Sequence, residues 1–258
     1  MRWGTMLIAQ ISDSHISHLG PTDEERIAAL AACVDQINQL NPQPALVVHT
    51  GDVVHNGSET EYEMAAEQLN RLNAELWVIP GNKDHRARMQ EAFPEACAVL
   101  DGTSYLQYVV DLDAARLVFL DTSSSETNKG RLCETRLAHL DDQLASADRP
   151  VLLFMHHPPF EVTTAPEPFQ FEARELVEKL AQVLAKHPPL VGIFAGHMHR
   201  HFETTWANVP ALTMTAGAID LRKGSELGPL QSVPYFCLHE VSPEGEVVTS
   251  LRQAAPQG

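Results

Sequence analysis

The chain alternates short apolar runs with amphipathic stretches, and most of the apolar runs end in a polar motif. In its first third, apolar runs at 6–12, 45–50 and 76–80 are separated by stretches in which apolar residues recur at helical spacing. This order of strand, helix, strand, helix, strand predicts right-handed crossovers and a parallel sheet. Because ligands of such sheets bind beyond the carboxyl ends of the strands, we expect a functional site there.

Two helices are expected between these strands. The first begins at Thr22, where Glu25 three residues later completes a capping-box pattern, and it ends at the Asn41-Pro42 pair. The second spans 58–73, where apolar side chains again share one face. Both helices are expected on the outside of the sheet.

The remainder of the chain predicts further strands, a second sheet and two more helices. Strands are expected at 105–110, 116–120, 151–155, 190–195, 211–216, 235–241 and 246–250, the last three in the second sheet, and helices at 132–144 and 172–186. Residues 253–258 are expected to fray. The chain has no repeat, low-complexity tract or clear linker, so residues 1–258 are expected to form one α/β domain with two sheets and outer helices.

Two segments, 160–172 and 218–234, are candidates for a cap, a lid or a contact within a homodimer or larger homo-oligomer. The first contains Phe160, Phe169 and Phe171 among prolines, which suits such a contact. A local core under a loop explains these three phenylalanines equally well.

Composition excludes several classes of protein. Hydrophobic residues make up 44% of the 258, which is enough for a sizeable core. A net charge of −16 argues against a partner that is a nucleic-acid polymer or an anionic membrane. The four cysteines form no C-x-x-C pair, which is typical of reduced thiols. The N-terminal apolar segment is too short for a membrane span and lacks a signal-peptide pattern, so a cytoplasmic protein is expected.

Five motifs stand where predicted strands end: Asp13-Ser14-His15, Gly51-Asp52, Gly81-Asn82-Lys83-Asp84, His156-His157-Pro158-Pro159 and Gly196-His197-Met198-His199. They supply seven oxygen and nitrogen donors, which are Asp13, His15, Asp52, Asn82, His156, His197 and His199. This mixed set suits Mn²⁺, Fe²⁺/Fe³⁺, Zn²⁺ or Co²⁺ rather than a thiolate zinc site. Two metal ions about 3.5–4 Å apart are a common device for hydrolysing phosphate esters, and they would supply positive charge for an anionic substrate.

Spacing within the motifs supports convergence of the donors. In an extended strand end, Asp13 and His15 point the same way, as do His197 and His199, so each pair is expected to meet at one centre. The glycines before Asp52, Asn82 and His197 allow a sharp turn and a close approach of the backbone to the site.

The motifs D-x-H, G-D, G-N-x-D, H-x-P and G-H-x-H, in this order over residues 7 to about 217, resemble those of the calcineurin-like metallophosphoesterases. The stretches 51–62 and 155–159 are similar to the bacterial branch of class III cyclic-nucleotide phosphodiesterases and glycerophosphodiesterases. This resemblance implies a four-layer α/β/β/α sandwich of two mixed sheets flanked by helices.

The resemblance also implies an activity, the hydrolysis of a small phosphodiester by a metal-activated hydroxide. The substrate could be a cyclic nucleotide, a glycerophosphodiester or a phosphonate monoester, and nothing in the sequence selects among them. Two other functions stay open: a phosphomonoesterase or nucleotide pyrophosphatase that uses the same site, and a metal-bound binding protein without catalytic activity.

The resemblance divides the seven donors between two metal ions. Asp13, His15 and His199 would hold the first metal ion. Asn82, His156 and His197 would hold the second, and Asp52 would bridge both.

One position departs from the family pattern. The family usually has histidine where this chain has Lys83, and that histidine lies over the phosphate. Either Lys83 does the work of the histidine as a proton or hydrogen-bond donor, or His85 reaches in instead, or the enzyme relies on its metals alone. His55 and His157 are further candidates for contact with the phosphate, and a structural role explains each equally well.

Overall fold

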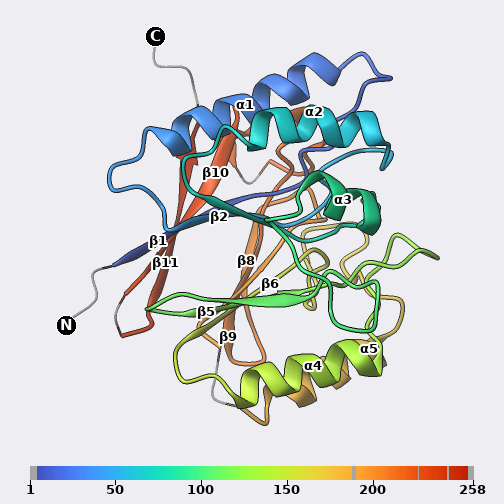
Figure 1. The fold of residues 1–258 in the computed structure, drawn as a ribbon, viewed down its shortest axis with the longest axis vertical. Coiled ribbons are helices and arrows are strands. Elements are labelled where there is room, and N and C mark those ends of the chain that lie inside the picture. Colours follow the sequence, from blue (N-terminus) through green and yellow to red (C-terminus); the bar gives the residue numbers. More distant parts are fainter. Residues whose placement is uncertain (1–4, 188–189, 226, 243, 255–258) are drawn as a thin grey trace.

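The computed structural model describes residues 5–187, 190–225, 227–242 and 244–254. Two sheets lie face to face in the middle of the molecule, and helices cover the outer surface of each (Figure 1). Helices α1 (Asp23–Asn38) and α2 (Glu59–Leu69) lie over one sheet, and α4 (Glu134–Ala145) and α5 (Arg174–Leu184) lie over the other. These are the four layers that the family resemblance implies.

The first sheet has the strand order β11-β10-β1-β2-β3. Its strands are β1 (Met6–Ile11), β2 (Leu46–His49), β3 (Glu75–Val78), β10 (Tyr235–Val241) and β11 (Val247–Gln253). As predicted, β1, β2 and β3 are parallel neighbours.

Strands β10 and β11 correct two predictions. The sequence analysis assigned them to the second sheet, but β10 pairs with β1 in antiparallel register, with Gln10 opposite Cys237. The pattern of β10 shows that both of its faces are buried, but it carries no information on which strand it will pair with. Gln253 also pairs with Tyr235 and is not frayed, while 255–258 lie outside the described residues.

The second sheet has the order β4-β5-β6-β7-β9-β8. Its strands are β4 (Tyr108–Asp111), β5 (Arg116–Leu120), β6 (Val151–Met155), β7 (Gly192–Ala195), β8 (Phe202–Trp206) and β9 (Val209–Thr213). Strands β5, β6, β7 and β9 are parallel, and β4 pairs with β5 in antiparallel register. The sequence analysis missed β8, an edge strand whose residues alternate between half-buried and exposed.

At the first residues of the helices, one predicted cap is absent and one capping box was not predicted. The Thr22 side chain makes no capping bond to α1, and the Thr22 backbone, with φ of −108° and ψ of 8°, lacks the extended conformation usual at an N-cap. Its hydroxyl donates to Asp220 Oδ2 at 3.2 Å. A complete capping box is present at α2, between Ser58 and Glu61. A short helix, α3 (Arg86–Ala92), was also missed, and the 3₁₀ turns η1 (Ile219–Leu221) and η2 (Gly228–Ser232) lie in the predicted cap segment 218–234.

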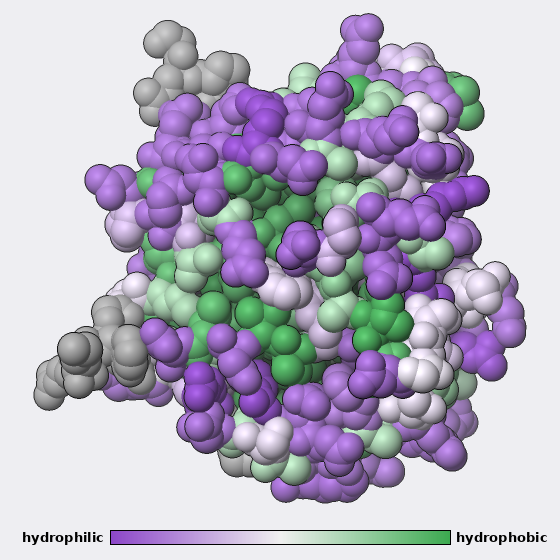
Figure 2. Space-filling view, in the orientation of Figure 1, coloured by the Kyte–Doolittle hydropathy of each residue, from purple (hydrophilic) through white to green (hydrophobic). Residues whose placement is uncertain are grey.

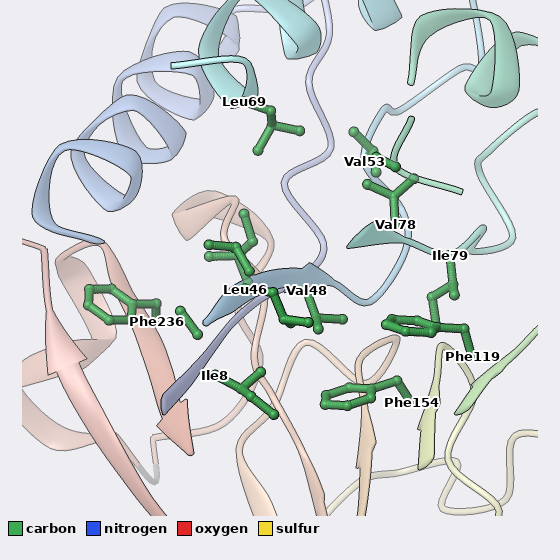
Figure 3. Close-up of a cluster of buried hydrophobic side chains, with 14 of the residues drawn as sticks. Ile8, Leu46, Val48, Val53, Leu69, Val78, Ile79, Phe119, Phe154 and Phe236 are labelled. Atoms are coloured by element: carbon green, nitrogen blue, oxygen red, sulfur yellow. The ribbon is translucent and has the colours of Figure 1, made fainter. Parts of the chain in front are cut away.

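The main core lies between the two sheets. Ile8 and Val48 of the first sheet face Phe119 and Phe154 of the second, and all four side chains are fully buried (Figure 3). On the face drawn in Figure 2, hydrophilic residues dominate and apolar surface is confined mainly to a band across the middle. In the part of the chain described, no helix is both long enough and apolar enough to cross a bilayer.

A second core lies between the second sheet and its helices, and it includes Phe160 and Phe171 from the segment 160–172. These two side chains are only 4% and 1% exposed. They therefore form the local core under a loop that the sequence analysis left as an alternative to an oligomer contact. All four cysteines are free thiols, as predicted, and three of them are buried.

Candidate metal centre

The predicted ligands lie at the carboxyl ends of β1, β2, β3, β6 and β7, as expected. Five of the seven have a left-handed backbone, with φ of 52° at Asp13, 45° at His15, 50° at Asp52, 67° at His197 and 51° at His199. Residues other than glycine seldom adopt this conformation, which costs roughly 1–3 kcal/mol each and clusters at functional sites. The fold therefore stores strain where the sequence predicts metal ligands.

The first group of donors contains Asp13, His15, Asp52 and His199. The Nε2 atom of His199 lies 3.2 Å from Asp13 Oδ1 and 3.0 Å from His15 Nε2. The His15 Nε2 atom also lies 3.6 Å from Asp52 Oδ2. We call these four residues the first cluster.

The second group contains His156, His157 and His197. The predicted ligand Asn82 joins it, since its Oδ1 atom lies 3.2 Å from His156 Nε2. Asp52 Oδ2 lies 3.5 Å from the same His156 nitrogen. We call Asn82, His156 and His197 the second cluster, and the Oδ2 atom of Asp52 lies between the two clusters.

His157 is better placed to support the second cluster than to bind a metal ion or phosphate. It is 0% exposed, and its Nε2 atom lies 3.1 Å from the Asn128 carbonyl oxygen, which can only accept a hydrogen bond. The proton is therefore on Nε2, and the Nδ1 lone pair is taken by the Thr122 hydroxyl at 2.9 Å. No ring nitrogen is left for another partner, and the bonds attach the loop after β5 to the centre.

The two histidines of the Gly196-His197-Met198-His199 motif separate. His199 belongs to the first cluster and His197 to the second, so the expectation that this pair meets at one centre is wrong. Both residues have a left-handed backbone, whereas the prediction assumed an extended one. The family resemblance assigned His199 and His197 to different metal ions, in agreement with this separation.

The hydrogen bonds of three histidines leave Nε2 available for a metal ion. His156 Nδ1 lies 2.8 Å from the Thr50 carbonyl oxygen, and His199 Nδ1 lies 3.1 Å from that of Leu221. Because a carbonyl accepts only, Nδ1 carries the proton in both rings. His15 Nδ1 lies 3.3 Å from His55 Nδ1, which can accept from it in the same way. This is the arrangement that metal-binding histidines typically have, so the residues present fit metal ions.

The clusters differ in protonation. Burial dominates at His15 and lowers its pKa to about 3, although Asp52 and Asp13 oppose this. Burial also opposes charge on His156, but the charge and hydrogen bond of Asp52 raise the pKa of this ring to about 9. The pKa of Asp13 falls to about 2 despite its burial, because His199 stabilises the carboxylate.

Two glycines allow the backbone to approach the ligands closely. A Cβ atom at Gly81 would lie 2.2 Å from Asp52 Oδ1, and one at Gly196 would lie 2.5 Å from Asp13 Oδ2. Both distances are far below van der Waals contact. These positions therefore exclude any side chain, in agreement with the role predicted for the motif glycines.

Lys83 and His55 are half-buried residues beside Asp52 and His15. The Lys83 backbone N–H donates to Asp52 Oδ1 at 2.7 Å, and its amine has no hydrogen-bond or ion-pair partner among the described residues. Burial lowers the pKa of His55, and the charges of Arg26 and Lys83 lower it further. Lys83 thus acts electrostatically on the ring that contacts His15.

His85 is exposed and begins α3, where its Nδ1 atom accepts from the Arg88 N–H at 3.4 Å. Through this bond, the Nδ1 atom of His85 caps the start of α3.

Sequence reasoning gave no role to Asp84, although it is the last residue of its motif. Its carboxylate accepts from the N–H groups of Gly81, Val53 and Val54 at 2.9, 3.2 and 3.4 Å and from the Tyr62 hydroxyl at 3.0 Å. Burial and the nearby Asp52 raise its pKa to about 7. Asp84 joins the loops that carry Asp52 and Asn82, and its fixed place in the G-N-x-D motif was the signal for it.

A groove of about 630 Å³ opens beside His197. Residues from 127–129, 165–170 and 197–200, together with Lys223, line it. The second range belongs to the segment 160–172, which the sequence analysis gave as a candidate cap or lid. Three cations, Lys129, Arg200 and Lys223, lie along this groove in a chain of net charge −16.

Comparison with known proteins identifies the family. Residues 6–201 match the family described as calcineurin-like phosphoesterase. The chain belongs to this family. It is accordingly a metal-dependent phosphoesterase, as the sequence analysis predicted.

Relatives with assigned activities include two kinds of phosphodiesterase. The chain is 32% identical over 253 residues to a probable glycerophosphodiester phosphodiesterase GpdQ of Arcobacter nitrofigilis, covering 95% of this chain and 92% of the relative. It is 36% identical over 187 residues to a probable cyclic nucleotide phosphodiesterase of Rhodopseudomonas palustris, covering 70% and 66%. A dimetal phosphatase from Danio rerio shares the fold, with a TM-score of 0.77, 16% identity and 98% coverage of both chains.

Proposed function

We propose that the protein hydrolyses a small phosphodiester at a dinuclear metal centre. Asp13, His15 and His199 would hold one metal ion, and Asn82, His156 and His197 would hold the other. Asp52 would be shared by both. The single observation that carries this proposal is the position of Asp52 Oδ2, which is 3.6 Å from His15 Nε2 in the first cluster and 3.5 Å from His156 Nε2 in the second.

Two bound cations would lower the pKa of a water molecule and offset the charge of the phosphate. The protein's own groups hold the ligands in place for this chemistry. The Lys83 N–H fixes one oxygen of Asp52, and the Thr50 carbonyl fixes the ring of His156. A ligand set already fixed by such bonds loses little free energy to reorganisation during the reaction.

We assign the proton or hydrogen-bond donor of the reaction to Lys83. Its amine is not engaged by other described residues, and its backbone is bonded to the shared ligand Asp52. An ammonium group has three donors and can reach either a phosphate oxygen or the leaving-group oxygen.

The groove beside His197 supports a diester rather than a monoester. Its volume of about 630 Å³ provides room for the second substituent that distinguishes a diester. The relatives from Arcobacter nitrofigilis and Rhodopseudomonas palustris are also named as phosphodiesterases. We propose a glycerophosphodiester or a cyclic nucleotide as the substrate class.

The test compares bis(p-nitrophenyl) phosphate with p-nitrophenyl phosphate, using metal-stripped protein reloaded with Mn²⁺. We expect faster hydrolysis of the diester and no measurable turnover by Asp52→Ala. Faster hydrolysis of the monoester would replace the proposal with a phosphomonoesterase. Full metal loading without hydrolysis of either ester would support the binding protein instead.

The role of Lys83 is tested in the same assay with Lys83→Met and Lys83→His. We expect Lys83→Met to lower kcat by roughly 10²–10³-fold, as is usual for the loss of a general acid or an electrostatic donor. Lys83→His restores the family residue and should recover most of the rate. Lys179→Met, which changes an exposed lysine of α5, is the matched control and should match the wild type. Wild-type rates for Lys83→Met would exclude the role.

A further inference from the structure

In His197 the ring nitrogen that contacts another protein group is not the one that does so in the other three cluster histidines. In His15, His156 and His199 the partner lies at Nδ1 and leaves Nε2 for the centre. In His197 the partner is Gln170, whose Oε1 atom lies 3.0 Å from Nε2. The segment that contains Gln170 was predicted only as a cap or contact surface.

The orientation of the Gln170 amide follows from its second bond. Its Nε2 atom lies 2.6 Å from the Glu167 carbonyl oxygen, which can only accept. The amide nitrogen must therefore face Glu167, and the amide oxygen must face His197. An amide oxygen also only accepts, so His197 carries its proton on Nε2 and keeps its lone pair on Nδ1.

The backbone around Gln170 is held on both sides. The Gly130 N–H donates to the Gln170 carbonyl at 2.8 Å, and the Glu172 N–H donates to the Gly130 carbonyl at 3.0 Å. Phe171 is 1% exposed and would be only 3.0 Å from a Cβ atom at Gly130. The segment 167–172 is therefore fixed in place, and it holds the Gln170 amide beside His197.

From this geometry we infer that Gln170 is a positioning residue for the metal centre, holding His197 in the Nε2–H tautomer so that Nδ1 is its metal-binding atom. The partners of His156 and His199 are backbone carbonyls, which substitution does not remove. Gln170 is a side chain, so this bond can be deleted. Outer partners of metal-bound histidines typically change metal affinity by about 10–100-fold.

The inference rests on the proposed metal centre, and the experiment uses two readouts that do not depend on turnover. The first is long-range ¹H–¹⁵N NMR of the metal-free full-length protein, which distinguishes the two neutral tautomers of a histidine. We expect His197 as the Nε2–H tautomer in the wild type and a mixture in Gln170→Met. An Nδ1–H tautomer in the wild type would overturn the inference.

The second readout is calorimetric titration with Mn²⁺, in which two metal sites of different affinity would give two binding steps. We expect Gln170→Met to weaken one binding step by about 10–100-fold and to leave the other unchanged. Gln170→Glu keeps an acceptor and should recover most of the affinity. Gln182→Met, an exposed glutamine of α5, is the matched control and should bind as the wild type does.

His197→Ala distinguishes a failure of the inference about Gln170 from a failure of the proposed metal centre. If His197→Ala weakens a step but Gln170→Met does not, the inference about Gln170 fails and the metal centre stands. If His197→Ala binds both Mn²⁺ ions normally, the proposed centre itself fails. Equal loss in Gln170→Met and Gln170→Glu would reduce Gln170 to a packing residue and would also overturn the inference.

Discussion

The two clusters differ in charge and in origin. The first contains two carboxylates, Asp13 and Asp52, and draws three of its four residues from the loops after β1 and β2. The second has no carboxylate of its own and shares that of Asp52. Its amide, Asn82, follows β3 of the first sheet, while its histidines follow β6 and β7 of the second.

The first cluster therefore depends mainly on one sheet, since only His199 comes from the loop after β7 of the second sheet, whereas the second cluster depends more on how the two sheets pack. We expect the first cluster to bind a divalent ion more tightly, because anionic oxygens attract it more strongly than an amide does. We also expect the second cluster to be more sensitive to changes between the sheets. The following predictions test this contrast, from the largest effect to the smallest.

The largest effect is expected for Asp52→Asn, which keeps the size of the side chain and removes its charge. Both metal-binding steps should weaken, because Asp52 Oδ2 faces both clusters. Loss of several kcal/mol of charge stabilisation corresponds to a fall in diester hydrolysis of about 10³-fold or more. Calorimetry with Mn²⁺ and initial rates measure the two losses. Weakening of one step alone would mean that the clusters do not share this ligand.

Asn82→Ala should weaken metal binding at the second cluster only. We expect one Mn²⁺ ion to bind with unchanged affinity and the other to weaken by more than about 100-fold, since a ligand should matter more than an outer partner. His157→Gln is the comparison, because its ring nitrogens are bonded to Thr122 and Asn128. A larger metal loss in His157→Gln than in Asn82→Ala would make His157 the ligand in place of Asn82.

The pH dependence of metal affinity should also differ between the two clusters. With a pKa of about 9, His156 is protonated at neutral pH, and a metal ion must displace that proton. Affinity at the second cluster should therefore rise about tenfold per pH unit between pH 7 and 8, with release of a proton. His15, with a pKa of about 3, is already neutral and adds no such slope to the first cluster. Titrations at both pH values, in buffers with different ionisation enthalpies, measure both quantities.

The smallest effect is expected for His55→Ala, which removes the ring that contacts His15. The first cluster should lose about tenfold in affinity, at the low end of the range for outer partners, because His55 is half-buried and water can replace it. The second cluster should be unchanged. His18→Ala, which changes an exposed histidine outside both clusters, is the control. An unchanged first step would leave phosphate contact as the remaining role predicted for His55.

Local patterns in the chain predicted much of the fold. Strands β5, β6 and β10 begin and end where expected, because each consists mainly of apolar residues and a polar residue follows its last one. The edge strand β8 and the seven-residue helix α3 were missed, since neither is long and apolar enough to show a period. The partner of β10 was assigned wrongly, because strand pairing depends on residues far away in the sequence.

The sequence by itself determined which chemistry is possible here. It placed five donor-bearing motifs at strand ends, and the structure brings the predicted donors together in two adjoining groups. Spacing within the motif did not separate His197 from His199, although the family resemblance did. Only the tertiary structure bonded both nitrogens of His157 and brought Gln170 to His197. The physical reason is distance along the chain. A motif specifies the atoms that can bind a metal ion, but the partner that selects one nitrogen of a ring comes from another loop, and only the packing of the two sheets places it there.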